Sequence, residues 1–266
     1  SKILFIKMMY ESKPSNDQEL TFTLSEFEKE EKAYKKSNNG NFIDYLFDRV
    51  KEEYEDDNVF DKRDVIRIKR ESFLSIIKTL QNINLYDADE DVKGVAFESF
   101  LGKTFRGELG QFFTPRSIVN YMIHVLDIKE GEKVGDPCCG SGGFLISAFD
   151  YVQNKIDRDI QDQIDILLKS DDRDKYKKIK VLQNEFRKDK VGSRYYKLCH
   201  NYFFGTDANS RMARTSKMNM IMHGDGHVGV YLHDGLINVG GMFNNRFDVI
   251  LINPPFGAHI GKNIKY

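Results

Sequence analysis

The stretch from Lys133 to Val152 constrains the fold of this chain more than any other part of the sequence. Its hydrophobic period changes in the middle, from a short strand at residues 133–136 to a helix from about Gly143. A glycine-rich turn, Pro137-Cys138-Cys139-Gly140-Ser141-Gly142, joins the two. Such a turn lets backbone N–H groups approach a ligand closely. Alone it indicates either a dinucleotide site or only a tight connection, and it is not a P-loop, because the Gly-Lys-Ser/Thr ending is absent.

Three further strands are predicted after this turn, at residues 201–206, 228–231 and 247–252. A helix is expected at residues 210–223, with Gly224 as its C-terminal stop. The charge-rich segment 156–197 contains no convincing strand, so we expect a helical insertion or a mobile loop there. Alternating strands and helices indicate a parallel sheet with helices packed on its faces.

The chain before residue 110 is predicted to be helical, because apolar side chains keep helical spacing at residues 42–50 and 73–80. Polar stretches at residues 12–18 and 35–41 are predicted loops. The alternating charges of residues 28–32 are interpreted as a solvated helix face. We therefore expect a helical N-terminal domain over residues 1–109 and an α/β domain over residues 110–266.

A helix start is predicted at Thr114-Pro115-Arg116, with the threonine as N-cap and the proline at the first helical position. The apolar residues that follow at helical spacing are expected to form a buried stripe. They are Ile118, Val119, Met122, Ile123 and Leu126.

The composition is that of an ordinary soluble globular protein, with 40% hydrophobic and 30% charged residues. The net charge of −1 means that contact with nucleic acid needs a local basic groove or a basic partner. The three cysteines and six histidines show no metal-ligand spacing, so no metal site is predicted. Without a membrane-spanning apolar run or a signal-peptide cleavage site, the chain is expected to be cytoplasmic, with no membrane partner.

A second motif, Asn253-Pro254-Pro255-Phe256, directly follows the last predicted strand. Two successive prolines fix φ and remove two N–H donors, so the loop is stiff. Its carbonyl oxygens can point outward as acceptors beside an aromatic ring. The motif alone fits a strand-ending turn, but the carboxyl ends of strands in open α/β sheets are also where ligands bind.

The two motifs together resemble the modification subunits of type I restriction–modification systems, within the N6-adenine DNA methyltransferases. The matching stretches are residues 110–116, 136–145, 205–219 and 253–257, in the family's order and over slightly more than half of the chain. The resemblance implies a Rossmann-like class I methyltransferase sheet preceded by a helical N-terminal domain. A complete sheet of this family has more strands, so the domain is expected to be truncated after its fourth strand, with the rest beyond this sequence or supplied by another polypeptide.

The resemblance also implies S-adenosyl-L-methionine as the cofactor. The residues expected to close over its methionine end are Gln111, Phe112, Phe113, Thr114, Pro115 and Arg116. Those expected to hold its methionine and ribose portions are Asp136, Gly140, Ser141, Gly142 and Gly143. Asp207 would accept hydrogen bonds from the ribose hydroxyls, although the family more often has glutamate there. Asp234 would accept from the cofactor's adenine amine, or would be only a turn residue before Gly235.

In the same family pattern, Asn253 and the Pro254 carbonyl accept hydrogen bonds from the exocyclic amine of a flipped-out adenine. Two acceptors pull that nitrogen toward tetrahedral geometry and localise its lone pair. Pro255 and Phe256 complete the loop, and the Phe256 ring stacks on the base. Cytosine-C5 chemistry is rejected, because it needs an activated cysteine and this loop contains none.

The implied function is site-specific adenine-N6 methylation of DNA. The implied partners are double-stranded DNA, a specificity subunit, a second modification subunit and a restriction subunit. Two alternatives stay open. Asn-Pro-Pro-aromatic loops serve planar amines generally, so an RNA amine or a protein amide is a second substrate class. The other alternative is a non-catalytic assembly module.

Overall fold

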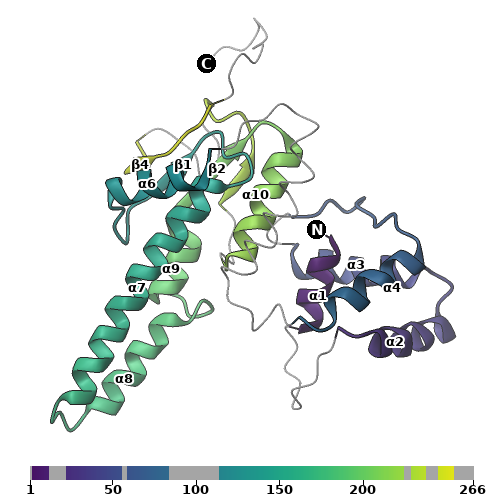
Figure 1. Cartoon of the computed structure of the whole chain (residues 1–266), viewed down its shortest axis with the longest axis horizontal. Helices are drawn as coiled ribbons and strands as arrows, with labels where there is room; N and C mark the ends of the chain where they lie inside the picture. Colours follow the sequence, from purple (N-terminus) through teal and green to yellow (C-terminus); the bar gives the residue numbers. More distant parts are fainter. Residues whose placement is uncertain are drawn as a thin grey trace, which may run out of the picture. The chain divides into compact units, whose positions relative to one another are not determined.

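The computed structural model of the chain describes residues 2–11, 22–55, 59–83, 114–224, 229–237 and 245–254. The chain divides into two compact units, Ser1–Phe97 and Glu98–Tyr266 (Figure 1). The domain boundary expected from the sequence, at residues 109–110, lies outside the described residues and stays a prediction, as does the loop expected at residues 12–18.

In its described part the first unit consists of helices. They are α1 (Lys2–Glu11), α2 (Leu24–Ser37), α3 (Phe42–Glu53) and α4 (Arg70–Leu80). The helices predicted at residues 42–50 and 73–80 are confirmed as α3 and α4. Apolar side chains of these helices form the core of the unit, and the fully buried ones are Phe5, Ile6, Leu46, Phe47, Val50, Phe73 and Ile77.

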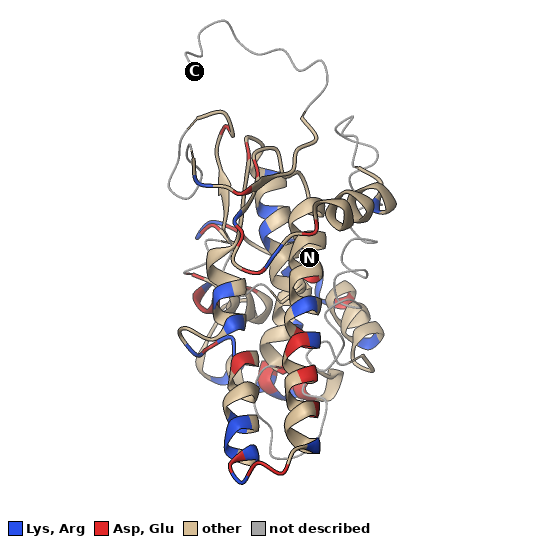
Figure 2. Ribbon diagram, turned by 90° about the vertical axis from the view of Figure 1, so that its left-hand side faces the viewer, with Lys and Arg blue, Asp and Glu red and all other residues tan. Residues whose placement is uncertain are grey.

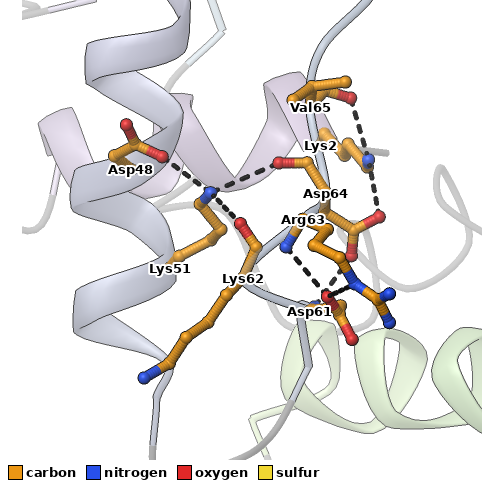
Figure 3. Close-up of polar contacts among 8 residues, drawn as sticks. All are labelled: Lys2, Asp48, Lys51, Asp61, Lys62, Arg63, Asp64 and Val65. Atoms are coloured by element: carbon orange, nitrogen blue, oxygen red, sulfur yellow. Dashed lines mark hydrogen bonds and ion pairs between the residues drawn. The ribbon is translucent and has the colours of Figure 1, made fainter.

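Two lysines fasten the loop between α3 and α4 to the helices (Figure 3). Lys2 of α1 donates from Nζ to Asp64 Oδ1 at 3.1 Å and to the Val65 carbonyl at 3.0 Å. Lys51 of α3 donates to the carbonyls of Lys62 and Asp64, at 3.0 and 3.3 Å. Since the two lysines come from different helices, this loop links α1 to α3.

Two predictions for α2 are wrong in part. The loop expected from residue 35 begins only after Ser37, because Lys35 pairs with Glu31 one turn earlier, at 2.9 Å, and so supports the last helical turn. Glu31 is not on a solvated face but buried. Both of its carboxylate oxygens accept from Arg70 of α4: Nε donates to Oε1 and Oε2 at 3.0 Å, and Nη2 donates to Oε2 at 2.6 Å.

We expect Glu31→Ala to lower the free energy of unfolding of the first unit by about 1 kcal/mol, because the variant loses a bidentate, charge-assisted contact. The effect is modest, since Arg70 is partly exposed and can return to water. Urea unfolding measures it. Glu28→Ala, an exposed position on the same helix, is the matched control. Equal stability of the two variants would contradict the assignment.

The second unit contains a four-stranded parallel sheet in the order β3-β2-β1-β4. The strands are β1 (Val134–Asp136), β2 (Phe203–Asp207), β3 (Val230–Leu232) and β4 (Val249–Ile250). The predicted strands and their parallel arrangement are confirmed. The strand expected over residues 247–252 is shorter than predicted, because only Val249 and Ile250 lie opposite β1. Within the described residues β4 is an edge strand beside β1, and its Ile250 is 61% exposed.

The helices of the second unit are α6 (Arg116–Leu126), α7 (Gly143–Lys169), α8 (Lys175–Gln183), α9 (Arg194–Asn201) and α10 (Ser210–Met222), with a 3-10 turn η1 (Asn184–Phe186). The segment 156–197 is thus helical, and α10 confirms the helix predicted at residues 210–223. No described helix has the length and apolarity that a bilayer span requires.

Helix α7 is longer than predicted, since it continues to Lys169 instead of ending near Val152. Its buried stripe runs on through Ile156, Ile160 and Ile164, at the i, i+4 spacing of one helix face. Helix α7 contacts α8 and α9, which lie beside it beyond the sheet (Figure 1). The sequence of α8 contains four lysines and no acidic residue, and Figure 2 shows these basic positions in blue along its ribbon.

The buried stripe predicted for α6 is only partly right. Val119 and Ile123 are buried, whereas Ile118 and Leu126 are about half exposed. Within the described residues the helix is covered along one narrow face, and Val119 and Ile123 are its i and i+4 positions.

Candidate functional site

The glycine turn follows the carboxyl end of β1 and leads directly into α7. Gly140 and Gly142 have positive φ angles, +55° and +88°, which L side chains rarely adopt. Gly142 is also limited by space, because a Cβ there would lie 2.6 Å from Ser216 Oγ and 3.5 Å from Ile146 Cδ1. Backbone and packing therefore both require glycine at position 142.

Neighbouring elements hold the backbone of this turn from two sides. The Gly140 N–H donates to Asp207 Oδ2 at the end of β2, at 3.0 Å. The Ser141 carbonyl accepts from Asn219 Nδ2 of α10, also at 3.0 Å. The two contacts fix the turn relative to β2 and α10.

Two carboxyl groups end adjacent strands beside the turn. Asp136 ends β1, is 1% exposed and accepts from the Cys138 N–H at 3.1 Å. Burial raises the pKa of Asp136 to about 7, and the nearby charge of Asp207 adds to the rise. Burial also raises the pKa of Asp207, although the N–H groups of Asn209 and Gly140 oppose this. Desolvated carboxyls at one edge favour a ligand with positive charge or hydroxyl donors.

The Asn-Pro-Pro motif lies at the same edge of the sheet. Gly135 of β1 is opposite Ile250 of β4, and the two strands run parallel. The glycine turn and Asn253 therefore follow the carboxyl ends of neighbouring strands. The Leu251 N–H donates to the Gly135 carbonyl at 2.9 Å, which extends this alignment toward Asn253.

The start of α6 joins the two motifs. Asn253 Nδ2 donates to Thr114 Oγ1 at 3.0 Å. Two residues further on, Arg116 Nη1 donates to the Gly143 carbonyl and to Ser147 Oγ, both at 2.9 Å. One short segment thus contacts both the Asn-Pro-Pro motif and the first turn of α7.

The predicted cap of this helix is wrong by one residue. Pro115 is the N-cap of α6, and its carbonyl accepts from the N–H groups of Ile118 and Val119. Thr114 is not the cap, because it lies outside the helix with its hydroxyl against Asn253.

Asp234 follows β3 and caps its own turn. Its Oδ1 accepts from the Leu236 N–H at 3.0 Å and its carbonyl from the Ile237 N–H at 3.1 Å. A Cβ at Gly235 would lie 2.0 Å from the Pro137 carbonyl oxygen, so this turn packs tightly against the glycine turn. The geometry favours the turn interpretation of Asp234, and its adenine contact remains a proposal.

Of the site residues predicted from the sequence, Gln111, Phe112, Phe113, Pro255 and Phe256 lie outside the described residues. The others lie in or beside the connections that follow the strands, as described above. The sequence reasoning missed Asn219 and Ser216, which are fully buried under the turn. Polar residues three positions apart on one buried helix face were the available signal.

The strand order β3-β2-β1-β4, the glycine turn after β1 and the carboxylates after β1 and β2 define a Rossmann-like fold of the methyltransferase class. The chain belongs to the N-6 DNA Methylase family, whose model matches residues 88–266.

Known proteins agree with this assignment. The chain is 28% identical over 153 residues, 57% of its length, to the type I restriction enzyme EcoEI methylase subunit of Escherichia coli. It is 30% identical over 171 residues, 63% of its length, to the MjaIX methylase subunit of Methanocaldococcus jannaschii. The type I restriction-modification system methyltransferase subunit from Streptococcus thermophilus has the same fold, with a TM-score of 0.51 and 18% identity over 97% of this chain. The matches cover 24% and 23% of the two relatives and 48% of the solved chain.

Proposed function

We propose that this chain forms the cofactor- and base-binding part of an adenine-specific DNA methyltransferase, the modification subunit of a type I restriction–modification system. One observation carries the proposal: the glycine turn and the Asn-Pro-Pro motif follow neighbouring parallel strands, and the segment Thr114–Arg116 contacts both Asn253 and the first turn of α7, which directly follows the glycine turn. A methyltransferase has to bring its methyl donor and its methyl acceptor together, and two binding motifs on neighbouring strands meet that requirement.

The residues at the turn fit S-adenosyl-L-methionine. Within the described part of the chain, the N–H groups of Ser141 and Gly143 have no hydrogen-bond partner, and they lie at the N-terminus of α7, which favours a carboxylate. The Asp136 carboxyl suits the methionine ammonium, and Asp207 suits the ribose hydroxyls. When bound, the cofactor supplies an electrophilic methyl group on its sulfonium.

Asn253 and Pro254 act on the target amine. Because Asn253 Nδ2 donates to Thr114 Oγ1, the acceptor role toward the target amine is assigned to the amide oxygen of Asn253. That oxygen and the Pro254 carbonyl accept the two hydrogens of the adenine amine, which localises the nitrogen lone pair for attack. Phe256, outside the described residues, is proposed to stack on the base, a contribution of about 1–3 kcal/mol.

The proposed partners follow from the relatives and from the charge. The relatives are named as subunits of restriction enzymes, and the net charge of this chain is only −1. Sequence recognition is therefore assigned to a specificity subunit, which binds double-stranded DNA together with two modification subunits, and cleavage to a restriction subunit.

The test is methyl transfer from labelled S-adenosylmethionine by the full-length protein with its specificity subunit. We expect label in duplex DNA and its recovery as N6-methyladenine after digestion to nucleosides. RNA and protein are offered in parallel reactions. Label in either of them instead of DNA, or in another base, would overturn the proposal.

Cofactor affinity is expected to depend on the ionisation of Asp136. The pKa of its carboxyl is about 7 before binding, and only the charged form pairs with the ammonium. Below pH 7, binding has to expel a proton, so affinity is expected to fall up to about tenfold per pH unit. Between pH 7 and 8 this dependence is expected to level off, because the Asp136 carboxyl is then mostly charged. Calorimetry at pH 6, 7 and 8 measures the slope. Asp136→Asn should bind more weakly and lose this dependence, and an unchanged slope would contradict the assignment.

A further inference from the structure

Helix α10 presents two buried polar side chains to the glycine turn. Ser216 and Asn219 are both 0% exposed and lie three residues apart, on one face of the helix. Ser216 is the residue that a side chain at Gly142 would strike. Asn219 donates to the adjacent carbonyl, that of Ser141. This face of α10 therefore packs directly against the glycine turn.

In the described part of the chain, the side-chain amide of Asn219 is hydrogen-bonded through its nitrogen but not through its oxygen. Its Nδ2 has the Ser141 carbonyl as partner, whereas its Oδ1 is buried with no partner in the part of the chain that the structure describes. The reverse orientation of the amide would bring two oxygens together. A buried acceptor without a partner costs free energy that leucine, of similar volume, would avoid. The cost points to a role for the single hydrogen bond that Asn219 makes.

That hydrogen bond fixes one peptide unit at both ends. The peptide between Ser141 and Gly142 has its oxygen held by Asn219, and its N–H donates to the Cys139 carbonyl at 2.7 Å. With this plane fixed, the flanking N–H groups of Ser141 and Gly143 have defined directions. They are the donors that the proposed function assigns to the methionine carboxylate.

We propose that Asn219 is a positioning residue for the cofactor, which aims the N–H groups of Ser141 and Gly143 by holding the Ser141 carbonyl. The inference rests on the proposed function, since it requires a ligand with a carboxylate at the turn. Asn219 touches neither the cofactor nor the DNA base.

The test compares two ligands that differ at the amino-acid end. S-adenosylhomocysteine has the carboxylate and ammonium, whereas 5′-methylthioadenosine lacks both. We expect Asn219→Leu in the full-length protein to weaken S-adenosylhomocysteine binding about tenfold. Binding of 5′-methylthioadenosine is expected to stay within twofold of the wild type. Asn219→Ser, which is too short to reach the carbonyl, should give the same pattern if the leucine variant folds poorly.

Thr215→Val, which removes a different buried polar group from α10, is the matched control and should bind both ligands as the wild type does. Equal loss of both ligands in the Asn219 variants, or no loss of either, would overturn the inference while leaving the proposed function intact. A wild-type protein that binds neither ligand would overturn the proposed function and, with it, this inference.

Discussion

Asn253→Ala is expected to reduce methyl transfer to DNA at least a hundredfold while changing cofactor affinity less than twofold. The variant loses the side-chain acceptor that localises the lone pair of the target amine, an interaction needed most in the transition state. Removal of one such preorganised group typically costs on the order of a hundredfold to a thousandfold in rate. Single-turnover transfer to duplex DNA measures the step, and titration with S-adenosylhomocysteine measures cofactor binding.

Two variants sharpen this comparison. Asn154→Ala removes an exposed asparagine from α7 and should have no effect on either measurement. Thr114→Val leaves Asn253 in place but removes the hydroxyl that orients its amide, so we expect a smaller loss, roughly tenfold. Retention of more than a tenth of the activity by Asn253→Ala would refute the assigned role.

Gly142→Ala is expected to weaken cofactor binding on the order of a hundredfold and to lower stability. A Cβ at this position meets Ser216 Oγ at 2.6 Å, and the φ of +88° adds roughly 1–2 kcal/mol of backbone strain. The turn has to move to relieve the steric contact and the backbone strain, and this movement also displaces the N–H groups of Ser141 and Gly143. Calorimetric titration and thermal unfolding measure the two losses.

Gly192→Ala is the control that separates the effect of backbone strain from the effect of the steric contact with Ser216. Its φ of +90° matches that of Gly142, but a Cβ there has no atom within 4 Å. We expect it to lose about 1 kcal/mol of stability and to keep wild-type cofactor affinity. If both alanine variants bound the cofactor equally well, close packing of α10 against the turn would not be what the site requires.

The order of strands and helices in the second unit was predictable from the sequence, and the lengths of particular elements were not. Helix α7 was expected to end near Val152, because the charges after it obscured the continued spacing of Ile156, Ile160 and Ile164. Strand β4 was expected to cover the whole apolar run from Phe247, but ladder pairing depends on the length of its neighbour β1. Element boundaries are set by partners distant in sequence.

The candidate site divides in the same way. Its two motifs were predictable, because a glycine turn after a strand and two prolines after another express backbone preferences that act over a few residues. The contacts that assemble them were not. Thr114 meets Asn253 across 139 positions of the chain, and Asn219 meets Ser141 across 78.

The sequence by itself determined which segments become strands and helices and where the glycine and proline connections fall, since hydrophobic period and local φ preference are properties of neighbouring residues. Only the tertiary structure decided that β4 lies beside β1, that the segment Thr114–Arg116 contacts both Asn253 and the first turn of α7, and that α10 packs against the glycine turn. The physical reason is that strand order and helix packing follow from burial summed over the whole unit. No short window of residues contains that sum.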